Sequence, residues 1–210
     1  MPTTSDATTR VRDPEGTKRK ILAAALQEFS AKGIDGARVD GIAARAGVNK
    51  QLLYYYFGSK DGLFRAVLRE RLAERAPEAA HADRVGPARL AEQQDRLAAQ
   101  RDWIRLLMWE ALERSGRNRV EQEAIRRVTL EQWVRAVEHA QAQGALPGNL
   151  DARQFVLSEL ATVLFPLAFP QLTRMVTGMS ATSPEFLAQR RAFLEELGAM
   201  LSNGAERVTE

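Results

Sequence analysis

The chain has 210 residues, of which 45% are hydrophobic and 27% are charged, a composition typical of soluble globular proteins. It contains no cysteine and only two histidines, His81 and His139. This excludes a disulfide scaffold, a thiol nucleophile and a metal site built on Cys or several His.

The net charge of +3 is unevenly distributed. Residues 1–76 carry 14 Lys and Arg against 9 Asp and Glu, whereas residues 77–210 carry 16 against 18. A basic N-terminal part (residues 1–76, here called the front) followed by a nearly neutral remainder (residues 77–210, here called the body) is typical of a nucleic-acid-binding module joined to a second domain. A solvated surface with chance asymmetry would have the same composition.

Four helices are predicted in the front part, because apolar residues recur there at helical spacing. Their boundaries follow from capping residues: Gly33 ends the first helix, Gly47 ends the second, Asn49 caps the third and Ser59 caps the fourth. The first helix is expected to begin at Thr17. The predicted helices cover residues 17–32, 39–46, 50–57 and 60–77.

Five further helices are predicted in the body, over residues 87–100, 102–114, 119–143, 151–170 and 184–201. Pro166 and Pro170 are expected to kink or end the fourth of these. No strand-like alternation and no internal repeat is present. The sequence therefore predicts an all-α protein of about nine helices, with an N-terminal three-helix helix-turn-helix domain and a helical-bundle C-terminal domain.

The expected domain organisation has four parts. Residues 1–15 form a disordered arm, residues 16–60 the helix-turn-helix domain, residues 61–80 a linker helix and residues 81–210 the helical bundle. The polar N-terminus lacks the apolar segment of a secretory signal. The longest strongly apolar stretch, residues 160–169, is shorter than the roughly 20 residues that span a bilayer. We expect a cytoplasmic protein with no membrane association.

The segment from residue 38 to residue 57 has the spacing of a helix-turn-helix. Ala43 is the small residue where two helices cross, and Gly47 supplies the turn between them. In such motifs the second helix enters the major groove with its first residues on the base edges. Lys50 is placed to donate to guanine and Gln51 to pair with adenine. A simple corner between two helices is the structural alternative.

The stretch from Thr17 to Leu68 resembles the DNA-binding domain of TetR-family transcriptional regulators. The match rests on IAARAGVNKQLLYYYFGSKDGLFRAVL, and within it on the cluster Tyr54, Tyr56, Phe57 and Lys60. The resemblance implies a homodimeric repressor on a palindromic operator in double-stranded DNA. It also implies a divergent C-terminal domain that holds a small-molecule inducer.

The resemblance gives each matched residue a role. Tyr54 and Tyr56 are expected to donate hydroxyl hydrogen bonds to phosphates, and Lys60 to place its charge on the DNA backbone. Val39 stands where the family usually has Thr, so Arg38 is expected to supply that phosphate contact instead. Further basic residues could approach flanking phosphates or be solvated, namely Arg10, Arg12, Lys18, Arg19 and Lys20.

Aromatic and apolar residues gather in the middle of the body. They form either the core of the bundle or the wall of a cavity for a hydrophobic or aromatic effector. Arg105 and Glu110 are less favoured polar candidates. The predicted pocket residues are Trp103, Leu107, Trp109, Leu112 and Trp133.

The last helices are predicted to form the dimer. Residues 160–169 are apolar almost all round, and a helix buried on every side needs a partner on each side. Two helices from each subunit would give a four-helix interface, although a monomer core is the alternative. The predicted interface residues are Leu160, Leu164, Phe165, Phe193, Leu197 and Leu201.

An enzyme is disfavoured by the sequence. It has no glycine-rich phosphate loop, no GxSxG motif and no metal-ligand cluster, and no cofactor is expected. The remaining alternative is a constitutive DNA-binding homodimer without an effector. A body cavity of roughly 300 Å³ or more would favour the ligand-responsive protein over this alternative.

Overall fold

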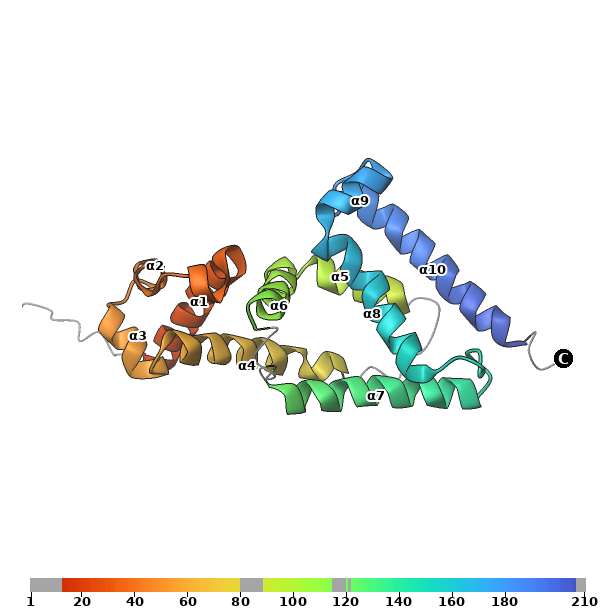
Figure 1. Ribbon diagram of the computed structural model, residues 1–210, viewed down its shortest axis with the longest axis horizontal. Helices are drawn as coiled ribbons and strands as arrows, with labels where there is room; N and C mark the ends of the chain where they lie inside the picture. Colours follow the sequence, from red (N-terminus) through yellow and green to blue (C-terminus); the bar gives the residue numbers. More distant parts are fainter. Residues whose placement is uncertain (1–12, 80–88, 115–119, 121, 207–210) are drawn as a thin grey trace, which may run out of the picture.

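The computed structural model describes residues 13–79, 89–114, 120 and 122–206 (Figure 1). Every regular element in these ranges is an α-helix, which confirms the predicted all-α class. These ranges contain ten helices, one more than expected. They are α1 (Pro14–Gly36), α2 (Val39–Ala46), α3 (Lys50–Phe57), α4 (Lys60–Ala79), α5 (Arg89–Ala98), α6 (Arg101–Arg114), α7 (Glu123–Ala142), α8 (Ala152–Ala168), α9 (Pro170–Thr177) and α10 (Pro184–Glu206).

Helix α1 begins earlier than predicted. The carboxylate of Asp13 accepts a hydrogen bond from the backbone N–H of Gly16 at 2.8 Å, and Pro14 occupies the first helical turn. This Asp-Pro pair is an N-cap followed by a residue that needs no N–H there. Thr17, the predicted cap, lies inside the helix and donates its hydroxyl to the carbonyl of Asp13. The arm was predicted over residues 1–15, but residues 13–15 form the cap and first turn of α1. Residues 1–12, with Arg10 and Arg12, lie outside the described residues.

The turn between α2 and α3 is built as predicted. Gly47 has a left-handed backbone (φ 68°, ψ 33°), which costs little only for glycine. Asn49 caps α3 by accepting from the N–H of Leu52 at 2.7 Å. Behind this turn, Phe29 of α1 meets Phe64 of α4 edge to face at 5.4 Å between ring centroids. Helices α1 to α4 therefore share one core.

Helix α5 lies against both α8 and α10, and α7 packs on α8 and on part of α4 (Figure 1). One apolar cluster joins α7 to α8 through Val137 and Val156. A second joins α5, α6, α8 and α10, with Val163 and Leu194 fully buried. In the body, α8 contacts α5, α6, α7 and α9, while α5 contacts α6, α8 and α10.

The break between α8 and α9 accounts for the additional helix. Helix α8 continues past Pro166, and the chain then leaves helical geometry at Phe169 (φ −121°, ψ 64°). Pro170 cannot continue α8, because it lacks an N–H and restricts the residue before it. No single helix in the described ranges is long and apolar enough to cross a membrane. Helices α8 and α9 reach the required length and hydropathy only when they are taken together, and the angle between them is 89°.

Candidate functional site

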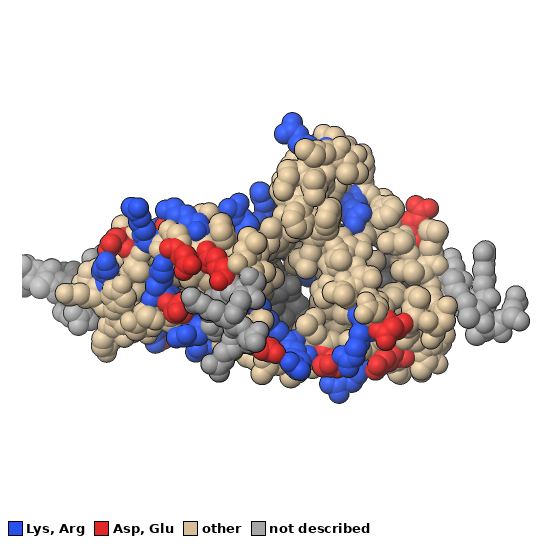
Figure 2. Space-filling view, in the orientation of Figure 1, with Lys and Arg blue, Asp and Glu red and all other residues tan. Residues whose placement is uncertain are grey.

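Basic side chains gather at the end of the molecule that holds α1, α2 and α3, with acidic side chains among them (Figure 2). Lys50 and Gln51 are both exposed in the first turn of α3. The ammonium of Lys50 lies 3.0 Å from the carboxylate of Asp40 on α2, and this ion pair raises the pKa of Lys50. A base or phosphate that binds Lys50 must therefore compete with Asp40.

The three tyrosines of α3 occupy different environments. Tyr54 is 39% exposed and Tyr55 is 80% exposed. Tyr56 is partly buried against the shared core, with the ammonium of Lys18 5.6 Å from its ring centroid. Tyr55, which was not among the predicted phosphate contacts, is the most accessible. Its position two residues after the buried Leu53 was the available signal, because that spacing places it across the helix.

The side chain of Lys60 makes hydrogen bonds within the protein. Its ammonium donates to the backbone carbonyls of Asp35 and Ala37 at 3.1 and 3.3 Å. Two of its three donors thus hold the connection between α1 and α2, a role that differs from the predicted phosphate contact. Arg38 is exposed at the N-cap of α2 but makes no side-chain cap bond, and Val39 is buried. The expected phosphate role of Arg38 stays a prediction.

A buried carboxylate that the sequence reasoning missed holds α1 to α2. Glu28 accepts from Lys32 at 2.7 Å, from Arg45 at 3.1 Å and from the backbone N–H of Arg38 at 3.5 Å. These bonds, led by that of Lys32, keep the pKa of Glu28 below its ordinary value despite burial. Because Arg45 belongs to α2, Glu28 fixes how the helix-turn-helix sits on α1.

Helix α6 is locked onto α1 at a break in α1. Gly33 is non-helical (φ 75°, ψ 179°), so the backbone groups on either side of it need other partners. On one side, Arg105 Nε and Trp109 Nε1 donate to the carbonyl of Ser30 at 2.8 and 3.2 Å. On the other, the Glu113 carboxylate accepts from the N–H of Ile34 at 2.8 Å. These α6 residues lie one turn apart and form a ladder, here called the α1–α6 contact.

This contact changes the interpretation of the predicted pocket residues. Trp103 is buried in the front core and Leu107 packs beside it, while Trp109 is bound to α1. Leu112 is 69% exposed. Trp133 lies elsewhere, packed beside the α7–α8 cluster with Arg89 over its ring. Within the part of the chain that the structure describes, the five residues do not line a common cavity, because the face of α6 that carries the first three is used against the front domain.

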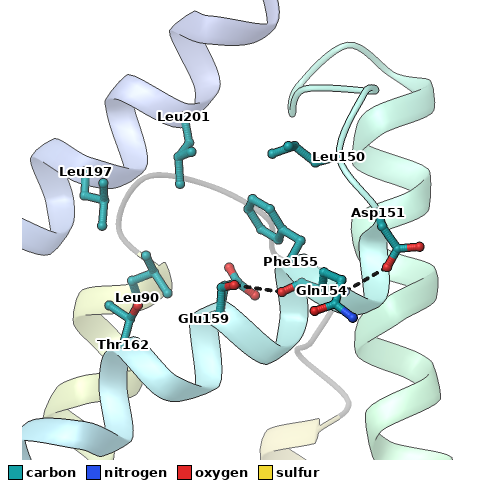
Figure 3. A pocket seen from close by; sticks show the side chains of 10 residues that line it. Leu90, Leu150, Asp151, Gln154, Phe155, Glu159, Thr162, Leu197 and Leu201 are labelled. Atoms are coloured by element: carbon teal, nitrogen blue, oxygen red, sulfur yellow. Dashed lines mark hydrogen bonds between the residues drawn. The ribbon is translucent and has the colours of Figure 1, made fainter.

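The body contains a different cavity, of about 320 Å³, between α5, α8, α10 and the turn before α8 (Figure 3). It is here called the body cavity. None of the predicted pocket residues lines it, whereas Leu197 and Leu201 of the predicted dimer set do. Its lining residues are Leu90, Leu150, Asp151, Gln154, Phe155, Ser158, Glu159, Thr162, Leu197 and Leu201.

The predicted dimer residues divide into two groups. Phe165 of α8 is 48% exposed and Phe193 of α10 is 52% exposed. The leucines among them are partly buried in the protomer and pack against the two body clusters. Leu157 and Met200 are exposed as well, eight residues before Phe165 and seven after Phe193. These spacings place each pair on one helix face.

Comparison with known proteins identifies both parts of the chain. Residues 21–67 match the family described as "Bacterial regulatory proteins, tetR family", and residues 88–198 match "Tetracyclin repressor-like, C-terminal domain". The chain belongs to the TetR family. As a TetR-family protein it is a DNA-binding transcriptional regulator and not an enzyme, in agreement with the sequence analysis.

Several relatives of this TetR-family protein are similar over most of its length. The HTH-type transcriptional repressor SCO4008 of Streptomyces coelicolor is 36% identical over 171 residues, which cover 80% of this chain and 86% of that protein. The HTH-type transcriptional regulator SrpR of Pseudomonas putida is 31% identical over 147 residues, covering 66% and 68%. The solved structure of SCO4942 from Streptomyces coelicolor aligns with a TM-score of 0.67 at 27% identity, covering 86% of this chain and 95% of that one.

Proposed function

We propose that this regulator is a homodimeric repressor that leaves a two-fold symmetric operator when a small molecule enters the body cavity. The repressor assignment is supported by SCO4008, a relative described as a transcriptional repressor. The observation that carries the ligand response is the body cavity itself, since its volume of about 320 Å³ suits a small molecule. A constitutive repressor would have no use for such a cavity.

DNA recognition is assigned to α3. Its first turn presents Lys50 and Gln51 to base edges, and the exposed hydroxyls of Tyr54 and Tyr55 are available for phosphates. Lys50 exchanges Asp40 for a guanine or a phosphate in the complex. Tyr56 supports the helix from behind through the shared core.

Dimerisation is assigned to the exposed apolar faces of α8 and α10. Large apolar side chains are exposed on both helices, including Phe165 and Phe193. Arg190 of α10 brings the two helices together, since it donates to the carbonyl of Thr162 on α8 at 2.8 Å. A two-fold pairing of these faces sets two copies of α3 about 34 Å apart, or a multiple of that, for successive major grooves.

The signal is assigned to α6 together with α4. Helix α4 continues directly from the DNA-binding domain. Helix α6 packs against α8 of the body and contacts α1 next to the non-helical Gly33. A ligand shifts the balance between two arrangements only through its difference in affinity for them. A tilt of α6 would move α1 and, through Glu28 and Arg45, the helix-turn-helix.

The experiment starts with genomic DNA. Fragments retained by the full-length protein define the operator, and gel-shift titrations with library compounds then measure release. The proposal predicts compounds that bind the protein and weaken operator binding by about tenfold or more, the usual range of allosteric coupling. If compounds occupy the body cavity and operator affinity stays unchanged, the constitutive alternative replaces it.

A further inference from the structure

A second cavity lies where the front meets the body. It has a volume of about 510 Å³ and is here called the junction cavity. Helices α4 and α6 both pack on α1, and each of the three contributes to the lining (Figure 1). From the front come Gln27, Ser30, Ala31 and Arg71, and from the body come the turn before α6 and the start of α6. The junction cavity shares no lining residue with the body cavity.

The charge of this lining favours an anion. Its charged residues are Arg71, Arg101, Arg105 and Asp102, and its other residues are neutral. Three guanidinium groups against one carboxylate give the lining a net charge of +2. A guanidinium group binds two oxygens of a phosphate or carboxylate at once through its planar fork of N–H donors.

The guanidinium group of Arg105 is already held in place. Its Nε donates to the carbonyl of Ser30 at 2.8 Å, and its Nη2 donates to the carbonyl of Ala31 at 3.5 Å. Its Nη1 makes no hydrogen bond to the residues that the structure describes. Because the side chain is ordered before an anion binds, little further conformational entropy is lost on binding.

The other two arginines are available to an anion. Arg101 is exposed at the first position of α6 and forms no ion pair within the described ranges. Arg71 is paired at 2.6 Å with Glu74 of its own helix, and the Glu74 side chain is 53% exposed. An exposed pair of this kind contributes little free energy, so a ligand oxyanion can replace Glu74.

Asp102 is the one acidic residue of the lining. Its carboxylate accepts a hydrogen bond from the hydroxyl of Ser30 at 3.3 Å. Its negative charge lowers the affinity of the cavity for any anion. Because the Coulomb energy grows with the product of the charges, a multiply charged anion gains more from the remaining excess of arginines than chloride or a monocarboxylate does.

We propose that the junction cavity is a second binding site, which takes a small multiply charged oxyanion of the organic phosphate or polycarboxylate kind. Arg71 of α4 binds it together with Arg101 and Arg105 of α6. Its volume of about 510 Å³ admits a molecule larger than a bare phosphate ion. Such an anion connects the front to the body, because its ligands come from both. The site goes beyond the proposed function, since anion binding there requires neither an effector in the body cavity nor an operator.

Pyrophosphate, citrate and acetate test this on the full-length protein without DNA, by isothermal titration calorimetry at one fixed ionic strength. Pyrophosphate or citrate should bind about tenfold or more tightly than acetate. Arg101→Gln should weaken that binding by about threefold to tenfold, because one charged donor is lost. Arg96→Gln is the matched control, since Arg96 is an exposed arginine of α5 that does not line the cavity, and its affinity should stay within about twofold.

Asp102→Asn provides a readout of the opposite sign. The amide oxygen can still accept from Ser30 while the negative charge is removed, so anion affinity should rise by about threefold. A variant with a damaged fold would bind more weakly instead, and Arg101→Gln can therefore be interpreted beside it. Tighter binding of pyrophosphate than of citrate supports a phosphate ligand, and the reverse order supports a polycarboxylate.

Three results would overturn the assignment. The first is that neither pyrophosphate nor citrate binds at millimolar concentration. The second is that Arg96→Gln and Arg101→Gln weaken binding equally, which would indicate general attraction to a basic surface. The third is that Asp102→Asn fails to strengthen binding. None of these results bears on operator release by a body-cavity ligand, which is measured separately.

Discussion

The carboxylate of Glu113 on α6 accepts a hydrogen bond from the backbone N–H of Ile34 on α1 at 2.8 Å, across 79 positions of sequence. Ile34 follows the break at Gly33, so its N–H has no carbonyl of a continuous helix to bind. The body thus completes a hydrogen-bond pattern that the front domain leaves open. This gives a physical connection between the proposed ligand site and the DNA-binding surface.

Gly33→Ala should destabilise the protein strongly. Gly33 has φ 75°, and a Cβ there would lie 2.2 Å from Glu113 Oε1 and 2.8 Å from Trp109 Cε3. We expect a loss of about 2–4 kcal/mol in urea unfolding, from backbone strain plus displacement of α6. Gly144→Ala is the matched control, since Gly144 has φ 70° with nothing within 4 Å, and it should lose only about 1 kcal/mol. Equal losses would show that the α1–α6 contact adds nothing.

Glu113→Ala should reduce the effect of a ligand on operator binding more than it reduces operator binding itself. The operator affinity of the ligand-free protein should stay within about threefold, because Glu113 lies on α6 and not on α3. The factor by which a ligand weakens operator binding should fall by about threefold to tenfold. Gel shifts with and without saturating ligand measure both quantities. An unchanged factor would remove α6 from the proposed route.

Gln51 and Tyr54 should affect DNA binding differently. Gln51→Ala should relax preference at one base pair of each half-site by about 1–3 kcal/mol, because a base-edge contact is lost. Tyr54→Phe should weaken all sequences alike, because only a phosphate contact is lost. Affinities for the operator and its single-base variants distinguish the two. A change of preferred base in Tyr54→Phe would reverse the assignment.

Glu28→Gln should lower stability at neutral pH by about 1–3 kcal/mol, because the charged partners Lys32 and Arg45 lose their carboxylate. The folded-state pKa of Glu28 lies below its ordinary value of 4.5, so its contribution is complete above that value and is lost as the pH falls through the folded pKa. Urea unfolding from pH 7 to pH 3 should therefore show a shallower acid loss in the variant. If the unfolding free energies of the variant and the unmodified protein fell in parallel with pH, this prediction would be contradicted.

Phe165→Asp should convert the proposed dimer into a folded monomer. Phe165 is already 48% exposed in the protomer, so the charge disturbs the partner contact and not the core. Ile125→Asp on α7 is a matched control at 47% exposure. Sedimentation at micromolar concentration should give a monomer for the first variant and a dimer for the second. A dimer in both would move the interface away from α8.

The front domain could be predicted closely because its signals are local. Gly47 and Asn49 fix the turn by their own backbone and side-chain chemistry, and the structure shows both doing so. The Asp13-Pro14 start of α1 was equally readable and was missed. The exposure of Tyr55 could also have been predicted from its spacing to Leu53.

The body cavity could not be predicted in the same way. Helical periodicity shows that one face of α6 is apolar, but not which helix that face meets. Trp103 and Trp109 meet α1, and the cavity forms where α10 and α8 diverge beside α5. Its buried carboxylate, Glu159, is one of many scattered acidic residues in the sequence, and only burial distinguishes it.

The most direct test of the account is reciprocal linkage between the two sites. The dissociation constant of a fluorescent operator duplex is measured with and without a saturating cavity ligand. The ligand's own dissociation constant is then measured with and without saturating operator. The account predicts that both change by the same factor, about tenfold or more, as thermodynamic coupling requires. A ligand that fills the cavity and leaves operator affinity unchanged would contradict it.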